Sequence, residues 1–177
     1  LSENRLLELM EEALAARIIE ELPVSPGAGQ AGPGRFMFTH ALMQETLASE
    51  LSATRKVRLH ARIAVALEEM YGKQAEERAA ELAEHFAEAE SVLGRDRVAK
   101  YLTIAGERAV ANYAYEEGLN YLRRALAAKY GVSAISPEQV LDEAAAKLLF
   151  SMTRALGSLG MPDEAMACQE RAFDFFV

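Results

Sequence analysis

Apolar residues recur every three or four positions along most of the chain, which is the period of an α-helix with one buried face. The first such stripe is Leu6, Leu7, Met10, Leu14 and Ile18. Helices are also predicted after Thr39 and from residue 52 to 71, with the hydroxyls of Thr39 and Ser52 as N-caps. Further helices are predicted at residues 79–89, 97–112 and 115–130, and on either side of Gly160. The short breaks between them predict antiparallel neighbours.

Two short extended segments interrupt the helical pattern near the start of the chain. One follows Ile18, the other is Phe36-Met37-Phe38, and residues 23–34 between them are rich in glycine and proline. Helix, strand, loop, strand and helix is the order of the second half of a winged-helix domain, so residues 1–51 are predicted to be its C-terminal part. The pattern is already under way at Leu1, and we expect a fragment whose parent supplies the first helices.

The glycine-rich loop contains a G-x-G-x-x-G pattern in Gly27, Gly29 and Gly32. A dinucleotide-binding fingerprint requires a helix to begin there, so that its N-terminus faces the pyrophosphate. Pro33, Gly34 and an extended segment follow instead. The order therefore favours a hairpin loop over a phosphate-binding loop.

The second half of the chain repeats a pattern of small and large residues. The first copy has Leu102, Gly106, Gly118, Leu122 and Ala125, and the second has Leu149, Leu156, Gly160, Ala165 and Ala172. These spacings are typical of tetratricopeptide repeats, in which small residues lie where two helices cross. The copies are 47 residues apart (165 − 118) instead of about 34, so either the helices are longer or the segment after Gly131 is an insertion. Residues 52–177 are predicted to be an antiparallel array of such repeats, and the whole chain mainly α with one small β-hairpin.

Composition and charge narrow the classes of function. The 177 residues are 51% hydrophobic but only 7% aromatic, which is typical of close-packed helices. A net charge of -8 argues against a general nucleic-acid surface, which needs basic residues to neutralise phosphates. A single cysteine, Cys168, excludes an internal disulfide and fits a reducing compartment. No apolar run approaches the roughly 20 residues of a membrane helix, and we expect a cytoplasmic protein without membrane contact.

Several short runs of the chain resemble a known family. They are Phe36-x-Phe38-Thr39-His40-Ala41-Leu42, Glu45-Thr46-Leu47, Leu51-Ser52-Ala53, Arg58-Leu59-His60-x-x-Ile63-Ala64, Ala80-Glu81-Leu82-Ala83-x-His85-Phe86 and Ala105-Gly106-Glu107-Arg108-Ala109. Together they resemble the bacterial signal-transduction ATPases with numerous domains (STAND ATPases), in which an AAA-like nucleotide module precedes a winged helix and a superhelix of tetratricopeptide repeats. Many members are LuxR-type transcriptional regulators or carry an adenylate or guanylate cyclase domain.

The resemblance implies a role for His40. In this class a histidine at the strand-to-helix junction of the winged helix faces bound ADP, so His40 would sense the ADP phosphate in the full-length parent only. A histidine beside a helix N-terminus suits a phosphate chemically. The alternative is that His40 packs and hydrogen-bonds locally. No G-x-x-x-x-G-K-[ST] motif occurs, so we expect no cofactor in this fragment and ATP or ADP in the parent.

A partner surface is predicted on the concave face of the helical array, built by the first helix of each repeat. Its expected residues are Tyr101, Leu102, Arg108, Asn112, Lys147, Phe150 and Arg154. We expect a protein partner or a small effector there, and a neighbouring nucleotide-binding domain as a second partner. A homo-oligomer stays an open alternative.

The remaining histidines and the basic residues have plain interpretations. His60 falls on the apolar stripe of its helix, which favours a core residue over a ligand, and His85 is expected to face solvent. The three histidines lack the spacing of a zinc site, so no metal is predicted. The basic residues between positions 55 and 62 either meet an acidic neighbour or form a solvated face.

These observations predict a function without a catalytic site. Adjacent glutamates such as Glu68 and Glu69 diverge on a helix and are not acid–base pairs. We therefore expect a non-enzymatic regulatory and protein-interaction segment of a larger signal-transduction ATPase, which couples nucleotide state to effector or partner binding. The alternative is a DNA-contacting winged-helix module of a transcriptional regulator, with Arg17 or Arg35 touching the duplex.

Overall fold

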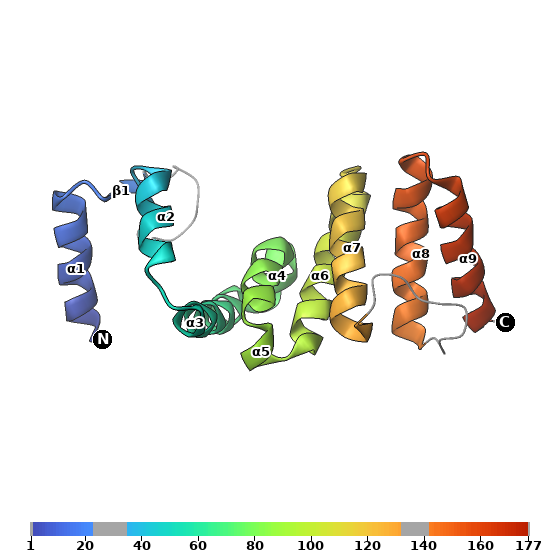
Figure 1. The fold of residues 1–177 in the computed structure, drawn as a ribbon, viewed down its shortest axis with the longest axis horizontal. Helices are drawn as coiled ribbons and strands as arrows, with labels where there is room; N and C mark the ends of the chain where they lie inside the picture. Colours follow the sequence, from blue (N-terminus) through green and yellow to red (C-terminus); the bar gives the residue numbers. More distant parts are fainter. Residues whose placement is uncertain (1, 23–34, 132–141, 177) are drawn as a thin grey trace. The chain divides into compact units, whose positions relative to one another are not determined.

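The computed structural model describes residues 2–22, 35–131 and 142–176 (Figure 1). Within them the chain is mainly helical with one small antiparallel hairpin of two strands, which confirms the predicted fold class at that level. The predicted wing at residues 27–34 and its G-x-G-x-x-G pattern lie outside the described residues. The chain divides into two compact units, Leu1–Lys56 and Val57–Val177.

The first unit contains two helices and the hairpin. Its elements are α1 (Glu3–Ala15), β1 (Ile19–Leu22), β2 (Arg35–Phe38) and α2 (Ala41–Ser49). The strands pair with Ile19 opposite Phe38 and Leu22 opposite Arg35. Among the described residues of this unit only Ile19 is buried, and α2 exposes Leu42 most, at 73%. The unit therefore buries little apolar surface of its own.

The prediction that Thr39 caps α2 is wrong. The residue at the N-cap position is His40, whose side chain makes no capping hydrogen bond. The Thr39 hydroxyl instead donates to the carbonyl oxygens of Arg17 at 2.7 Å and Ile18 at 3.2 Å. These two bonds hold the hydroxyl at the turn between α1 and β1, where Arg17 adopts a left-handed φ of 54°. Ser52 does accept a hydrogen bond from the Arg55 amide, at 3.4 Å.

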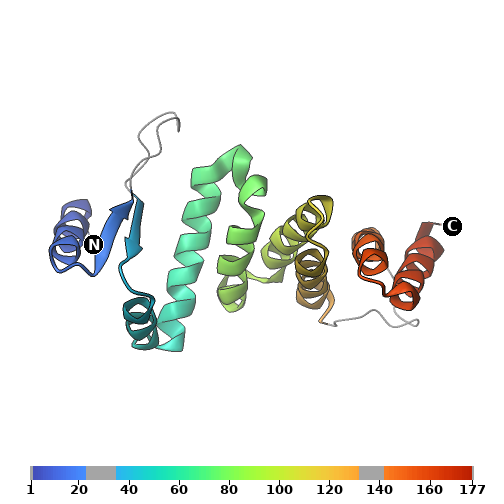
Figure 2. The same cartoon turned by 90° about the horizontal axis from the view of Figure 1, so that it is seen from above.

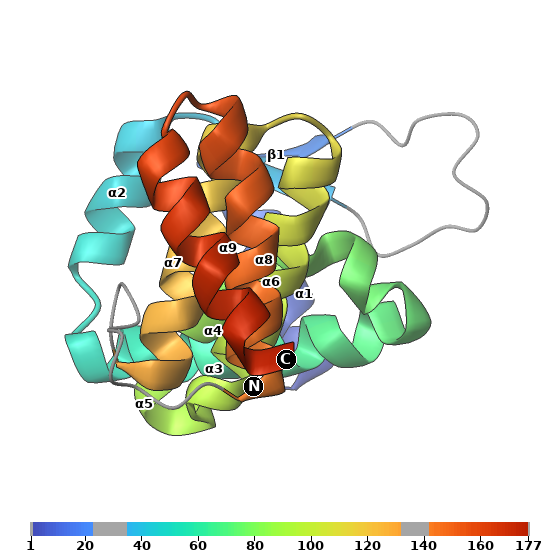
Figure 3. The same cartoon turned by 90° about the vertical axis from the view of Figure 1, so that its right-hand side faces the viewer.

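The second unit is helical, and its first helix begins just before the division between the units. Its elements are α3 (Ala53–Tyr71), η1 (Gly72–Arg78), α4 (Ala79–Glu88), α5 (Glu90–Leu93), α6 (Arg95–Ala111), α7 (Tyr115–Tyr130), α8 (Glu143–Ser158) and α9 (Pro162–Phe176). Figure 2 shows α6 beside α7 and α8 beside α9, and Figure 3 views these pairs from the C-terminal side, with α8 and α9 in front. The short elements η1 and α5 were not predicted.

The helices α6 and α7 approach each other most closely where Gly106 and Gly118 lie. A Cβ atom at Gly106 would stand 2.7 Å from the Leu122 Cγ, and one at Gly118 would stand 2.6 Å from the Val110 Cγ2. Neither distance leaves room for a methyl group. The two glycines let the helices close over Leu122, which is fully buried in the core of this unit.

The second helix pair, α8 and α9, turns at Gly160, which has a φ of 73°. Ala155, Leu156, Ala165 and Ala172 are buried between these helices and the rest of the unit. Helices α6 to α9 have 17, 16, 16 and 15 residues, which is not enough to account for the 47-residue spacing of the predicted repeat. The extra residues therefore fall between the end of α7 and the start of α8, in a segment whose residues 132–141 are not described.

Asp142 joins the two ends of that segment. It is the N-cap of α8, and its Oδ1 accepts from the Ala145 amide at 2.7 Å. The same oxygen accepts a hydrogen bond from the Tyr130 hydroxyl at the end of α7. Lys129 lies 3.8 Å from the other carboxylate oxygen. The hydrogen bond from Tyr130 is the main cause that lowers the pKa of the Asp142 carboxyl below its ordinary value.

The crossing of α6 and α7 predicts opposite effects for two glycine-to-alanine changes. We expect Gly118→Ala to lower the free energy of unfolding by about 1–3 kcal/mol, because the new methyl overpacks the crossing. Gly157→Ala, on a helix position where an added Cβ meets nothing within 4 Å, should raise it by up to about 1 kcal/mol through helix propensity. Urea unfolding of both variants tests this. If the free energy of unfolding changed in the same direction in both, the close approach of α6 and α7 at Gly118 would be contradicted.

The Asp142 contacts predict a loss of stability on Asp142→Ala. Removing the N-cap should lower the free energy of unfolding by about 1 kcal/mol at pH 7, whereas Asp142→Asn keeps an acceptor for the cap. Because the folded-state pKa of Asp142 is lowered, the contribution of its charge is present above its ordinary value of 3.8 and is lost as the pH falls below it. The urea midpoints of the wild type and Asp142→Asn should therefore differ at pH 7 and converge at pH 3.

Candidate functional site

The candidate site is a groove on the face formed by α6, α8 and α9. It consists of two adjoining hollows of about 360 Å³ each, which share Glu107 and Lys147. The first hollow is further lined by Phe150, Ser151, Gln169, Ala172 and Phe173. The second is further lined by Asp96, Ala99, Lys100, Thr103, Ile104, Lys129, Ala144 and Leu148. We call these residues together the groove.

Two exposed aromatic side chains dominate the first hollow. Phe150 of α8 is 67% exposed and Phe173 of α9 is 65% exposed. Each lies just beside the buried stripe of its helix: Leu149 precedes Phe150 and Ala172 precedes Phe173. Packing of the buried stripes fixes the two helices against each other, so it also fixes both rings on the same face. The result is an apolar surface on a rigid support.

The polar groups of the groove are held by contacts that water or a ligand can replace. The Ser151 hydroxyl donates to Glu107 Oε1 at 3.1 Å and so links α8 to α6. Lys147 Nζ lies 2.7 Å from Glu143 Oε1, one turn earlier on α8. Hydrogen bonding between these two groups raises the pKa of Lys147 and lowers that of Glu143. Lys147 is therefore a protonated and accessible donor at the centre of the groove.

The groove contains two of the residues predicted to bind a partner, Lys147 and Phe150. Arg154 is exposed on α8 but does not line the groove. Asn112 is exposed at the C-cap of α6. Arg108 turns toward η1, where its guanidinium donates to the Glu76 carbonyl oxygen at 3.3 Å. Of the predicted partner residues, only Lys147 and Phe150 therefore line the groove.

The placement of Tyr101 on a partner surface is wrong. Its side chain is 1% exposed, as is that of Leu102, and its ring stacks on Phe86 with 5.2 Å between ring centroids. The Tyr101 hydroxyl donates to Glu68 Oε1 at 2.6 Å. Burial and this hydrogen bond both raise the pKa of the Tyr101 hydroxyl. Helix α4 and helix α3 occupy the face of α6 that was assigned to a partner.

Several groove residues were not predicted as partner residues, above all Phe173 and Gln169 of α9. The expectation placed partner contacts only on the first helix of each repeat, whereas α9 is the second helix of its pair. The signal that could have found Phe173 is its position next to the small-residue stripe of Ala165 and Ala172. An aromatic residue beside such a stripe stays at the edge of the helix contact.

His40 is exposed at the start of α2. Its backbone is extended, and its carbonyl oxygen accepts from the Met43 amide at 3.0 Å. Helix α2 thus begins directly after His40, which occupies the N-cap position. The predicted contact with the phosphate of ADP in a parent protein stays a prediction.

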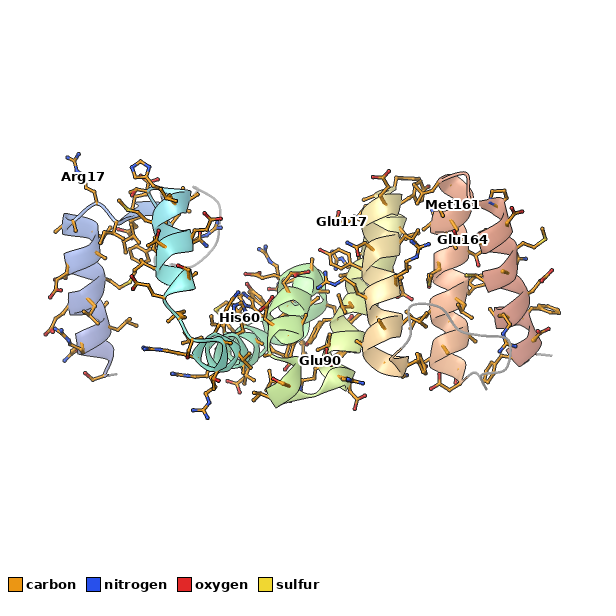
Figure 4. All side chains as sticks on the ribbon, viewed as in Figure 1. Arg17, His60, Glu90, Glu117, Met161 and Glu164 are labelled. Carbon is orange, nitrogen blue, oxygen red and sulfur yellow. The ribbon has the colours of Figure 1, made fainter. Side chains whose placement is uncertain are left out.

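The fold brings together the other two histidines, His60 of α3 and His85 of α4. Figure 4 labels His60 on α3. Their Nδ1 atoms are 3.1 Å apart, and their ring centroids are 5.1 Å apart. Both side chains are half-buried, so the expectation that His85 faces solvent is wrong. Among the described residues, no group of three or more His, Cys, Asp or Glu side chains is placed to hold a metal ion.

Comparison with known proteins adds no relative. No protein-family model, no curated protein and no solved structure matches the chain. In the described part of the chain, no helix is both long enough and apolar enough to cross a membrane.

The buried position of Tyr101 predicts a structural effect on mutation. Tyr101→Phe removes a hydrogen bond to a carboxylate and should lower the free energy of unfolding by about 1–2 kcal/mol. Tyr113→Phe is the matched control, because Tyr113 is 73% exposed and should change stability very little. Urea unfolding at pH 7 measures both; equal stability of the two variants would contradict the role given to Tyr101.

Proposed function

We propose that this chain is a non-enzymatic interaction and coupling segment of a STAND-type signal-transduction ATPase, a transcriptional regulator or a cyclase, and that the groove binds a segment of a partner protein. The observation that carries the proposal is the pair of exposed rings, Phe150 and Phe173, in one hollow. Contiguous exposed apolar surface on a folded protein commonly marks an interaction site. The first hollow, at about 360 Å³, is large enough to take an apolar side chain of a partner against the residues that line it.

The charge of the groove indicates the chemistry of the partner. Its lining contains three lysines, Lys100, Lys129 and Lys147, against two acidic residues, Asp96 and Glu107. Lys129 and Lys147 also contact the carboxylates of Asp142 and Glu143 at the edge of the groove. The groove thus offers exposed ammonium groups, for which the carboxylates of a partner can compete, in a chain whose net charge is -8. Electrostatic complementarity favours a partner segment with an apolar anchor and acidic residues beside it. The overall acidic charge disfavours a DNA duplex as the ligand.

The coupling role rests on the family resemblance and on the continuity of α3. This helix begins at Ala53 in the first unit and ends at Tyr71 in the second. A helix transmits a displacement between its ends better than a loop does, because its backbone hydrogen bonds are internal. In the proposed mechanism a partner in the groove favours one conformation of the parent by binding it more tightly. The nucleotide itself would be bound by the ATPase module of the parent.

A peptide-selection experiment tests the proposed groove. Random peptides displayed on phage are selected on the 177-residue chain, and the dissociation constants of enriched peptides are measured for the wild type and variants. We expect apolar–acidic peptides whose affinity falls about 30-fold or more in Phe150→Ala, the effect of truncating an aromatic hot spot worth about 2 kcal/mol.

Met166→Ala is the matched control for this experiment. Met166 is 57% exposed on α9 but does not line the groove, so this variant should bind like the wild type. Equal affinity of Phe150→Ala and the wild type, or an equal loss in Met166→Ala, would count against the groove.

A further inference from the structure

The two half-buried histidines form the contact between α3 and α4 on which this inference rests. His60 and His85 are 25 residues apart in the sequence, and their Nδ1 atoms face each other at 3.1 Å. Their rings are tilted by 43° to each other. Nothing in the proposed binding of a partner uses this pair, because neither residue lines the groove.

The contact sets a limit on the number of protons that the pair can carry. A hydrogen bond between two imidazole nitrogens needs one N–H and one lone pair. Two neutral rings meet that condition, and so does one imidazolium beside one neutral ring. Two imidazolium rings do not, because both Nδ1 atoms then carry a proton and both rings carry a positive charge. The contact is therefore compatible with one added proton on the histidine pair but not with two.

The charged groups around the pair do not remove this limit. On α4, the carboxylates of Glu81 and Glu84 favour protonation of His85. Glu81 already accepts from the Tyr71 hydroxyl at 2.9 Å, and Glu84 is paired with Arg124 of α7 at 2.7 Å. Desolvation by burial and then the neighbouring His60 outweigh the carboxylates and lower the pKa of His85.

We propose that the His60–His85 contact is a proton-sensitive latch, which holds α3 on α4 at neutral pH and releases it when both rings are protonated. Apolar packing at Ala64 and the Tyr101–Glu68 hydrogen bond also hold α3, so the latch adjusts its docking without being its sole support. Release of α3 from α4 would open the N-terminal edge of the helical unit, where α3 is its first helix. The latch goes beyond the proposed function and does not depend on it.

The direction of the pH effect follows from the histidine chemistry. A histidine whose pKa is lower in the folded state stabilises that state in its neutral form. This stabilisation is fully present above the ordinary value of 6.5 and is lost as the pH falls below it, through the folded-state pKa of His85. Opening of α3 takes up one additional proton in that range. Its equilibrium constant should therefore rise by up to about tenfold per pH unit.

Amide hydrogen exchange measured by mass spectrometry tests the latch on the full chain between pH 7.5 and pH 5, with rates corrected for intrinsic exchange. We expect the protection of residues 61–71 to fall in the wild type by up to about tenfold per pH unit as the pH drops below the ordinary histidine value of 6.5. Helix α8 serves as the internal reference and should keep its protection. His85→Gln and His60→Gln should lose the pH dependence of α3, because one neutral partner always remains.

His40→Gln is the matched control, since it removes the third histidine and leaves the pair intact. It should behave like the wild type. The same pH dependence in the wild type and His85→Gln would overturn the latch, and so would an equal loss of protection in α3 and α8. If a variant fails to fold, NMR titration of the ring Cε1 protons of the wild type decides: two separated steps support the latch, and two independent, coincident titrations overturn it.

Discussion

The close crossing of α6 and α7 is the constraint on which the second unit depends. Gly106 and Gly118 let the two backbones approach until a Cβ atom at either position would overlap with a neighbouring side chain. This approach buries Leu122 completely and places α6 where α4 packs on one side and α8 on another. Glu107 follows Gly106 directly, so the same crossing also sets the position of a residue that both hollows of the groove share. Packing of small residues thus determines the geometry of the surface.

Apolar burial, and not ion pairing, stabilises this unit. The core in the described residues consists of hydrophobic side chains, and no described polar or charged residue is buried. Ion pairs such as Arg124–Glu84 lie on the surface, where each contributes about 0–1 kcal/mol. Two half-buried hydrogen bonds between side chains involve α3, namely the Tyr101–Glu68 bond and the contact of the histidine pair. They orient that helix, and of the two contacts only the histidine pair consists of side chains of a type that commonly change charge between pH 5 and 8.

The groove and the histidine pair suit a regulatory segment in different ways. The groove offers apolar anchors on a rigid helical support, which is the usual form of a protein-binding surface. The pair acts on α3, the helix that connects the two units along the chain. A partner in the groove and a proton on the histidines would therefore act on separate elements of one helical unit. Neither requires a reaction to be catalysed.

Local periodicity in the sequence determined most of the helices, whereas the contacts between them came only from the tertiary structure. The helix predicted at residues 115–130 is confirmed as α7, because helical spacing and end signals are local. The cap predicted for Thr39 failed because its hydroxyl is held by the Arg17 carbonyl, 22 residues away, and the N-cap position falls to His40. In the same way, a helical stripe identifies Tyr101 and His85 as facing one side of a helix but not which helix covers that side. The covering helix is set by contacts between residues that are 33 positions apart for Tyr101 and Glu68 and 25 positions apart for His85 and His60. Such contacts form only when the whole unit packs.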